Sequence, residues 1–124
     1  MLLRAGDCQQ AIRIRRELAQ QASGNLAYKG NLATALVACG FSRDEARAIA
    51  DALAKVDRPF LRGEHLYERA RILAALGDDQ DAIRALQAAH AQGTRWPAVE
   101  LHLDQCWDPI RRSPAFVEML KPKG

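Results

Sequence analysis

The feature that most constrains this chain is a helix–turn–helix pattern in the stretch from Leu66 to Gly93, LYERARILAALGDDQDAIRALQAAHAQG. Apolar residues recur every three or four positions on both sides of a Gly-Asp pair, which is the period of an amphipathic helix. Gly77 is a residue type that ends helices in a left-handed turn, because it has no Cβ to clash. Two helices joined by so short a turn must pack antiparallel, so the stretch predicts a helical hairpin.

The same punctuation occurs at two earlier glycines. Gly6, Gly40 and Gly77 are spaced 34 and then 37 residues apart. Each is followed by a residue that can cap a helix and, three positions later, by an acid or an amide, as in a capping box. These pairs are Asp7 and Gln10, Ser42 and Glu45, and Asp78 and Asp81. We therefore expect all three glycines to be bends between helices, in an array with a period near 34 residues.

The remaining sequence also favours helix. It is rich in Ala, Leu and Arg, has few β-branched residues and contains no alternating strand pattern of useful length. The spacing predicts helices over about 8–22, 26–39 and 43–56, with Asn25 and Ser42 as N-caps. The inward side of the first of these helices is expected to carry Ala11, Ile14, Leu18 and Ala22.

The segment 94–124 is expected to cover the open end of the array, because the last unit of such an array needs a cover. Ser113 as N-cap and Pro114 at the first helical position predict a final helix to about Leu120. The side chains expected to plug the end of the core are Trp96, Trp107, Ile110 and Phe116.

These patterns resemble the tetratricopeptide (TPR) repeat family. The residues that match its consensus in the third unit are Leu66, Ala70, Leu73, Gly77, Ala82, Leu86 and Ala89. Arg69 departs, since a large apolar residue is usual there. The resemblance implies an all-α fold, with antiparallel helical hairpins stacked as a short TPR-like solenoid. The single domain 1–124 would divide into a partial repeat 1–24, repeats 25–59 and 62–93, and a C-terminal cap 94–124.

The stretch 103–116 is similar to the closing segment of TPR regions in large bacterial proteins, which often follow a Ser/Thr protein kinase, winged-helix regulator or cyclase domain. The family pattern is Leu-Asp-Pro, an aromatic, then Asp-Pro-Leu-Arg, an acid, Pro and an aromatic. Here Gln105 replaces the first proline, Ile110 the leucine and Ser113 the acid. The resemblance implies a regulatory C-terminal part of a larger bacterial protein.

In TPR proteins the first helices of the hairpins line a concave surface that binds extended ligands. By this resemblance, the lining residues are Lys29, Asn31, Thr34, Glu64, Tyr67, Glu68 and Arg71. Asn31, Tyr67 and Arg71 could hold a peptide backbone or a carboxylate through hydrogen bonds. The alternative is that all seven are ordinary exposed residues. The Lys/Asn/Arg set with which some TPR domains clamp a C-terminal carboxylate is not recognisable. We expect a non-catalytic scaffold that binds a protein or peptide.

A basic module that binds nucleic acid is the less favoured function. The net charge of +3 is small, and acids are spread among the cations. The dense basic clusters are Arg13, Arg15 and Arg16, and Arg111 and Arg112. A solvated face in which the first cluster pairs with Glu17 and its neighbours is the simpler reading.

The sequence predicts no enzyme, no metal and no cofactor. His102 and Cys106 are four residues apart and could share a metal, but two ligands do not complete a site, and His90 is only a remote third candidate. A Cys–His nucleophile pair would also need a third, orienting group, which is not recognisable.

Three cysteines, Cys8, Cys39 and Cys106, lie far apart in sequence. Their odd number and wide spacing predict reduced thiols in a cytoplasmic protein, with Cys39 packed as a small buried residue. No apolar run reaches the roughly 20 residues that cross a bilayer, so no membrane association is expected.

The first five residues are expected to be the last turn of a helix whose beginning is missing, so that the chain would be cut from a longer protein. The alternative is that the first full element is the helix from about Cys8 to Ala22. An incomplete first repeat would leave an apolar face exposed near Leu2, Leu3 and Ile12. That face makes a homo-oligomer a further possibility.

Overall fold

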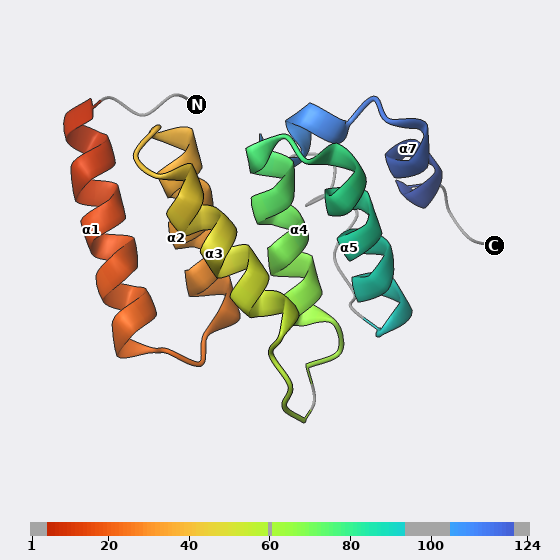
Figure 1. The fold of residues 1–124 in the computed structure, drawn as a ribbon, viewed down its shortest axis with the longest axis horizontal. Helices are drawn as coiled ribbons and strands as arrows, with labels where there is room; N and C mark the ends of the chain where they lie inside the picture. The colour runs from red at the N-terminus through yellow and green to blue at the C-terminus, as the bar shows by residue number, and fades with distance from the viewer. Residues whose placement is uncertain (1–4, 60, 94–104, 121–124) are drawn as a thin grey trace.

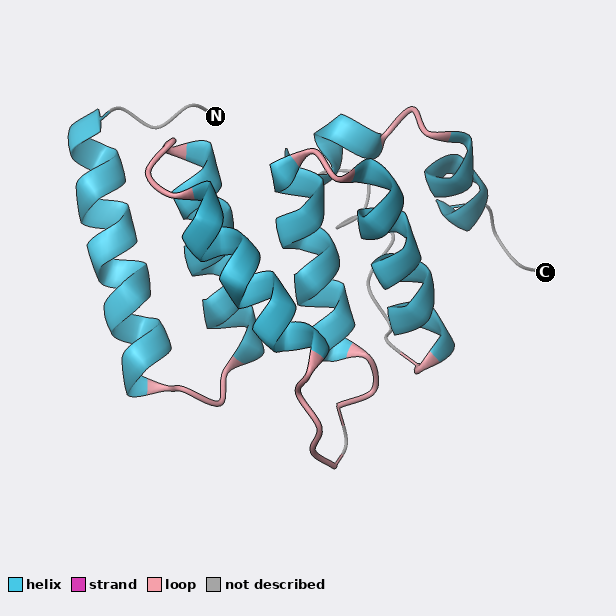
Figure 2. Cartoon of the chain, in the orientation of Figure 1, coloured by secondary structure: helices cyan, strands magenta, loops and turns pink. Residues whose placement is uncertain are grey.

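The computed structural model describes residues 5–59, 61–93 and 105–120, and every regular element within them is a helix (Figures 1 and 2). The elements are α1 (Ala5–Gln21), α2 (Leu26–Ala38), α3 (Arg43–Ala54), α4 (Glu64–Leu76), α5 (Asp79–Ala91), the 3₁₀ helix η1 (Gln105–Ile110) and α7 (Pro114–Leu120). The predicted all-α fold is therefore confirmed.

The helices pack as antiparallel hairpins arranged side by side in chain order, from α1 at one edge to α7 at the other (Figure 1). The hairpins are α2 with α3 and α4 with α5. The first helices of the two hairpins, α2 and α4, also pack directly against each other. The C-terminal elements lie against the second hairpin, with η1 on α4 and α7 on α5.

Both hairpins turn at the glycines that the sequence indicated. Gly40 and Gly77 have φ values of 67° and 86°, in the left-handed region that favours glycine. The two turns also share one hydrogen-bond pattern. The amide after each glycine donates to a carbonyl five residues back, Phe41 to Leu36 and Asp78 to Leu73, both at 3.0 Å. This pattern satisfies carbonyl groups that a helix end would otherwise leave unpaired.

Gly6 is not a bend, and the prediction that it separates two helices is wrong. Helix α1 begins at Ala5 and runs through Gly6, with Asp7 as an acid in its first turn. An acid near a helix start is stabilising both as a cap and within the first turn, because the helix dipole favours negative charge there. A Gly-Asp pair is therefore compatible with a helix that begins either before or after the glycine. Residues 1–4 lie outside the described part of the chain.

The predicted N-caps are only partly confirmed. The side chain of Asn25 accepts a hydrogen bond from the amide of Tyr28 at 3.0 Å, and Ser42 Oγ accepts one from the amide of Glu45 at 3.1 Å. The carboxylate of Asp78 makes no cap bond and instead pairs with Arg47 of α3 at 2.7 Å.

The main core lies between α2, α3, α4 and α5 and is closed by the C-terminal segment. Three of the side chains predicted to plug its end, Trp107, Ile110 and Phe116, are fully buried. The fourth, Trp96, lies outside the described residues. The rings of Trp107 and Phe116 pack against each other in a tilted arrangement, with their centroids 6.0 Å apart.

A disulfide joins Cys8 to Cys39, so the prediction of reduced thiols is wrong for these two residues. Because α1 and α2 are antiparallel, the start of α1 meets the end of α2, and the two Cα atoms lie 5.8 Å apart. The sequence separation of 31 residues gave no hint of this pairing. Cys39 is also partly exposed rather than buried.

Helix α1 is rotated relative to the predicted orientation. Ile14 and Leu18, which were expected to face inward, are 45% and 38% exposed. Cys8 and Ile12 are buried instead, and Ala19 packs on the same side. The predicted and the observed inward residues are both spaced as one face of a helix, so spacing alone did not distinguish them. Cys8, which forms the disulfide, lies on the face that packs on α2.

The Gly77 turn gives a direct test of the hairpin. A Cβ at Gly77 would have no atom within 4 Å, so a substitution there is strained by the backbone alone. We expect Gly77→Ala to lower the free energy of unfolding by about 1–2 kcal/mol and Gly77→Val by more, whereas Gly77→Asn should cost least because asparagine tolerates this conformation. Urea denaturation of the three variants measures the order. Equal losses in all three would contradict the assigned turn.

Candidate functional site

The candidate site is the surface where α2 and α4 meet. Asn31 and Thr34 lie one turn apart on α2, and Glu64, Glu68 and Arg71 follow one another at helical spacing on α4. The structure therefore brings together residues that are 40 positions apart in sequence, such as Asn31 and Arg71. These are five of the seven residues predicted to line a concave face.

An ion pair lies at the centre of this surface. Arg71 Nη1 donates to Glu68 Oε1 at 2.6 Å and to Asn31 Oδ1 at 3.2 Å. The side chains of Glu68 and Arg71 are only 6% and 16% exposed. A carboxylate that is so deeply buried requires a partner, since an unpaired buried charge is strongly destabilising. Glu68 thus forms part of the packing, while Asn31 stays partly exposed beside it.

Gly30 provides the space for Glu68. A Cβ built on Gly30 would lie 2.0 Å from Glu68 Oε1 and 3.0 Å from its Cδ. Glycine within a helix costs about 0.5–1 kcal/mol relative to alanine, so this position has a packing reason for its presence. Gly30 is not among the residues predicted from the sequence, although a single glycine inside an otherwise good helix indicates a close approach of another element.

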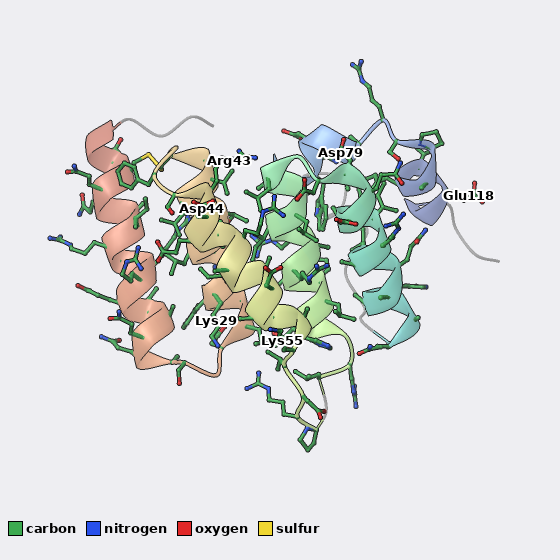
Figure 3. All side chains as sticks on the ribbon, viewed as in Figure 1. Lys29, Arg43, Asp44, Lys55, Asp79 and Glu118 are labelled. Atoms are coloured by element: carbon green, nitrogen blue, oxygen red, sulfur yellow. A yellow bond between two sulfur atoms is a disulfide. The ribbon has the colours of Figure 1, made fainter. Side chains whose placement is uncertain are left out.

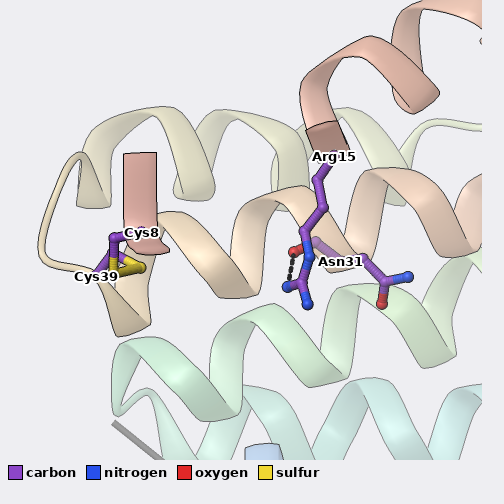
Figure 4. The surroundings of a disulfide bond; sticks show 4 residues. All are labelled: Cys8, Arg15, Asn31 and Cys39. Carbon is purple, nitrogen blue, oxygen red and sulfur yellow. Dashed lines mark hydrogen bonds between the residues drawn. A yellow bond between two sulfur atoms is a disulfide. The ribbon is translucent and has the colours of Figure 1, made fainter. Parts of the chain in front are cut away.

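Arg15 reaches the same surface from α1. Its Nη1 donates to the backbone carbonyl of Asn31 at 3.2 Å, and Thr34 Oγ1 donates to the same oxygen at 3.1 Å. Figure 4 shows the Arg15 guanidinium at that carbonyl, while the side chain of Asn31 extends away from it. Asn31 is therefore held by three different helices. No carboxylate of a described residue pairs with Arg15, whose remaining N–H groups can donate hydrogen bonds to a ligand.

Two of the predicted residues lie elsewhere in the structure or are packed. Lys29 is on the opposite side of α2 from Asn31, where it lines a separate groove between α2 and α3. Tyr67 is 9% exposed, and its ring centroid lies 5.7 Å from that of Trp107, so it joins the core to the C-terminal segment. Lys29 therefore lines a different groove from the surface around Asn31, and Tyr67 is buried beside Trp107.

The groove beside Lys29 has a volume of about 290 Å³ and mainly apolar walls. Its lining consists of Lys29, Leu32, Glu45, Ile49, Ala52, Leu53 and Val56. In Figure 3, Lys29 near the start of α2 and Lys55 at the end of α3 lie along the same lower edge of the molecule. The groove and the α2–α4 surface are thus on different sides of α2.

The arginine cluster of α1 is divided among three environments. Arg13 is exposed, Arg15 contacts Asn31, and both terminal nitrogens of Arg16 donate to Glu45 of α3. These hydrogen bonds lower the pKa of Glu45 and raise the pKa of Arg16, against the smaller opposing effect of burial on each group. Arg16 thus pairs across helices rather than with Glu17.

The described residues include neither a metal-binding cluster nor a membrane-spanning helix. Among them, no three His, Cys, Asp or Glu side chains are placed to hold a metal ion together. His102 lies outside the described part of the chain. Within residues 5–59, 61–93 and 105–120, no helix combines the length and the apolar character that a membrane span requires.

Comparisons with protein-family models, curated proteins and solved structures find no match to this chain. A function can therefore be inferred from the chemistry of the surface itself. That surface offers an amide, a hydroxyl and two guanidinium groups on rigid helices, and it contains two carboxylates, of which that of Glu68 is paired with Arg71. Such groups recognise peptide backbone and carboxylate oxygens.

The contact between Gly30 and Glu68 can be tested with a double-mutant cycle. Gly30→Ala should destabilise the fold by about 1–3 kcal/mol, because the new Cβ displaces a buried, ion-paired carboxylate. In a Glu68→Ala background the same change should be neutral or stabilising, since alanine is the better helix former and its Cβ then meets no carboxylate.

Urea denaturation of the four proteins gives the coupling energy of this cycle. A matched control is Gly24→Ala, whose Cβ would contact only the end of the Arg58 side chain at 3.2 Å. If Gly30→Ala stabilised the protein equally in both backgrounds, the close approach of α2 and α4 at this point would be disproved.

Proposed function

We propose that this chain is a non-catalytic, TPR-like domain that binds a protein or peptide segment along the α2–α4 surface. The observation that supports this function best is the convergence of Arg15, Arg71 and Thr34 on Asn31. It creates a polar, hydrogen-bonding patch between the first helices of two successive hairpins. In stacked helical arrays, that is the surface on which extended ligands bind.

The chemistry of the patch favours an extended peptide that carries a carboxylate. The amide of Asn31 can both donate to and accept from a peptide backbone. Arg71 is neutralised by Glu68, whereas the charge of Arg15 is unpaired among the described residues and would attract an acidic side chain or a C-terminus. The rigid helices reduce the entropy that is lost on binding.

Nucleic-acid binding remains the second candidate, and the structure gives it little support. Arg16 is paired with Glu45, so the α1 cluster leaves Arg13 and the remaining donors of Arg15 for a phosphate backbone. Arg111 pairs with Asp108 at 2.9 Å. Strong binding of DNA or RNA that weakens steeply with salt would favour this candidate over the first.

Two further proposals concern the parent protein and its cellular location. The resemblance of the stretch 103–116 supports a regulatory C-terminal part of a larger bacterial protein. A cytoplasmic location was inferred from reduced thiols, and the Cys8–Cys39 disulfide removes that support, because disulfides in the cytosol are usually transient.

Self-association is a further proposal. Ile12, one of the residues expected on an open apolar face, is buried on α2, and Leu2 and Leu3 lie outside the described residues. Ile14 and Leu18 are nevertheless exposed on α1 and would serve as an apolar contact. A light-scattering mass above the 13.7 kDa of the monomer supports this proposal, and a strict monomer rejects it.

Peptide selection followed by mutation tests the main proposal. Peptides selected from a random display library on the purified protein should bind it and lose about tenfold in affinity on Asn31→Ala or Arg15→Ala, since each change removes a hydrogen-bonding group worth about 1–1.5 kcal/mol. Fluorescence anisotropy with the labelled peptides measures the affinities.

The matched controls are Asp51→Ala and Lys55→Ala, two exposed positions on α3 and at its end that should leave affinity unchanged. Peptides that ignored Asn31 and Arg15 but lost affinity in these controls would move the binding site to the opposite side. A selection that returned no binding peptide would also count against the function.

A further inference from the structure

Helix α1 is attached to the rest of the protein mainly through one other helix. It packs mainly on α2, whereas α2, α3 and α4 each pack on at least two other helices. Its buried side chains, Cys8 and Ile12, face α2. Ile12 belongs to a small apolar cluster with Leu32, Ala35 and Leu36, which is separate from the main core. The core between the two hairpins therefore does not include α1.

The polar contacts of α1 are also weak. The Arg16–Glu45 pair joins α1 to α3, but its side chains are 40% and 36% exposed and so are well solvated. Arg15 contributes one partly buried hydrogen bond to the carbonyl of Asn31. The other large apolar side chains of α1, Ile14 and Leu18, are 45% and 38% exposed and so bury only part of their surface against the protein.

The disulfide is the strongest constraint on α1. It joins the beginning of this helix to the C-cap of α2, at the end opposite to the loop that connects the two helices (Figures 3 and 4). Both ends of α1 are thus covalently fixed to α2. A tether of this kind raises the effective concentration of α1 at its docking face. Without the disulfide, the contacts of described residues that oppose detachment are mainly those of the small cluster, Arg15 and Arg16.

The face under α1 has the properties of a helix-binding site. Leu32 and Leu36 of α2 and Ile49 of α3 form its apolar part, and Glu45 supplies a carboxylate at its edge. Leu32 and Ile49 also line the 290 Å³ groove, which continues this face. Helix α1 contributes Ile12 and the small Ala19 to the cluster, and none of its described residues lines the groove. A helix with a larger apolar side chain there would fit better than α1 does.

We propose that α1 is a redox-controlled strap over this face, and that reduction of the Cys8–Cys39 disulfide releases it and lets an amphipathic partner helix bind in its place. The partner carries apolar residues at helical spacing and an arginine opposite Glu45. This face lies under α1 and differs from the α2–α4 surface, and the proposal does not depend on the function proposed for that surface. Release of α1 would, however, withdraw Arg15 from Asn31.

The reaction is a thiol–disulfide exchange with a dithiol reductant. Its first thiolate attacks Sγ of the partly exposed Cys39, the S–S bond breaks, and Cys8 leaves as a thiolate that takes up a proton. The second thiolate of the reductant then displaces Cys39 from the mixed disulfide, and this thiolate is protonated in turn. Two electrons and two protons reach the protein, and the reductant becomes a disulfide.

Hydrogen exchange tests the release of α1. In the Cys106→Ser protein, which leaves only the disulfide pair, reduction with dithiothreitol should accelerate amide exchange in residues 9–21 at least tenfold while α4 and α5 remain protected. Unchanged protection of α1 after reduction would overturn the proposal. Loss of protection in α4 and α5 together with α1 would also overturn it, because the disulfide would then simply maintain the whole fold.

A labelled peptide of residues 5–22 with Ser at position 8 tests the docking face, because it carries the side chains of α1 but cannot form the disulfide. It should bind the reduced Cys106→Ser protein at least tenfold more tightly than the oxidised protein. An Ala19→Leu peptide should bind about tenfold more tightly again, since leucine buries more apolar surface in the groove. Fluorescence anisotropy measures all of these affinities.

Two peptide variants separate specific docking from general basic attraction. Arg16→Glu should weaken binding about tenfold or more, because it opposes Glu45. Arg13→Glu makes the same charge change at an exposed position and should have little effect. Equal losses for the two variants, or equal binding to oxidised and reduced protein, would reject the proposed face.

Discussion

The two hairpins approach closely where Glu68 of α4 packs over Gly30 of α2, and any side chain at position 30 would collide with the Glu68 carboxylate. A charge in this position is tolerated only with a partner, and Arg71 provides it. Because Arg71 must reach Glu68, its guanidinium also lies within hydrogen-bonding distance of Asn31. The packing of α2 on α4 and the polar character of the surface above them thus have one cause. The proposed binding surface is a by-product of the way in which the hairpins are joined.

The protein consists of two parts that differ in how they are held. The hairpins α2–α3 and α4–α5 share a continuous apolar core that Trp107 and Phe116 close at one end. At the other end, α1 rests on a separate small cluster and is secured by a covalent bond. Local stability should therefore differ between the two ends of the array, because cooperative units follow the buried apolar contacts. Chemical conditions can change the attachment of α1 without a change in the core.

Several features that depend on local chemistry could be predicted from the sequence, although the bend at Gly6 and the cap at Asp78 were predicted wrongly. The turns at Gly40 and Gly77 and the caps at Asn25 and Ser42 arise from residues close together in the chain, and all four were predicted. Features that depend on helix rotation or on distant pairs were not. Lys29 and Asn31 are two residues apart and so point to opposite sides of α2, which repeat spacing alone did not resolve. The Cys8–Cys39 pair required the antiparallel arrangement of α1 and α2 to be known.

The close approach at Gly30 also has a consequence for sequence variation. In any protein that keeps this packing, the residue at position 30 and the length of the side chain at position 68 cannot vary independently. A chain with a larger residue at position 30 would need a shorter one at position 68, and the arginine at position 71 would then lose its reason to be retained. Linked substitutions at these three sites would identify distant relatives that share this inter-hairpin geometry when overall similarity is too low to align them.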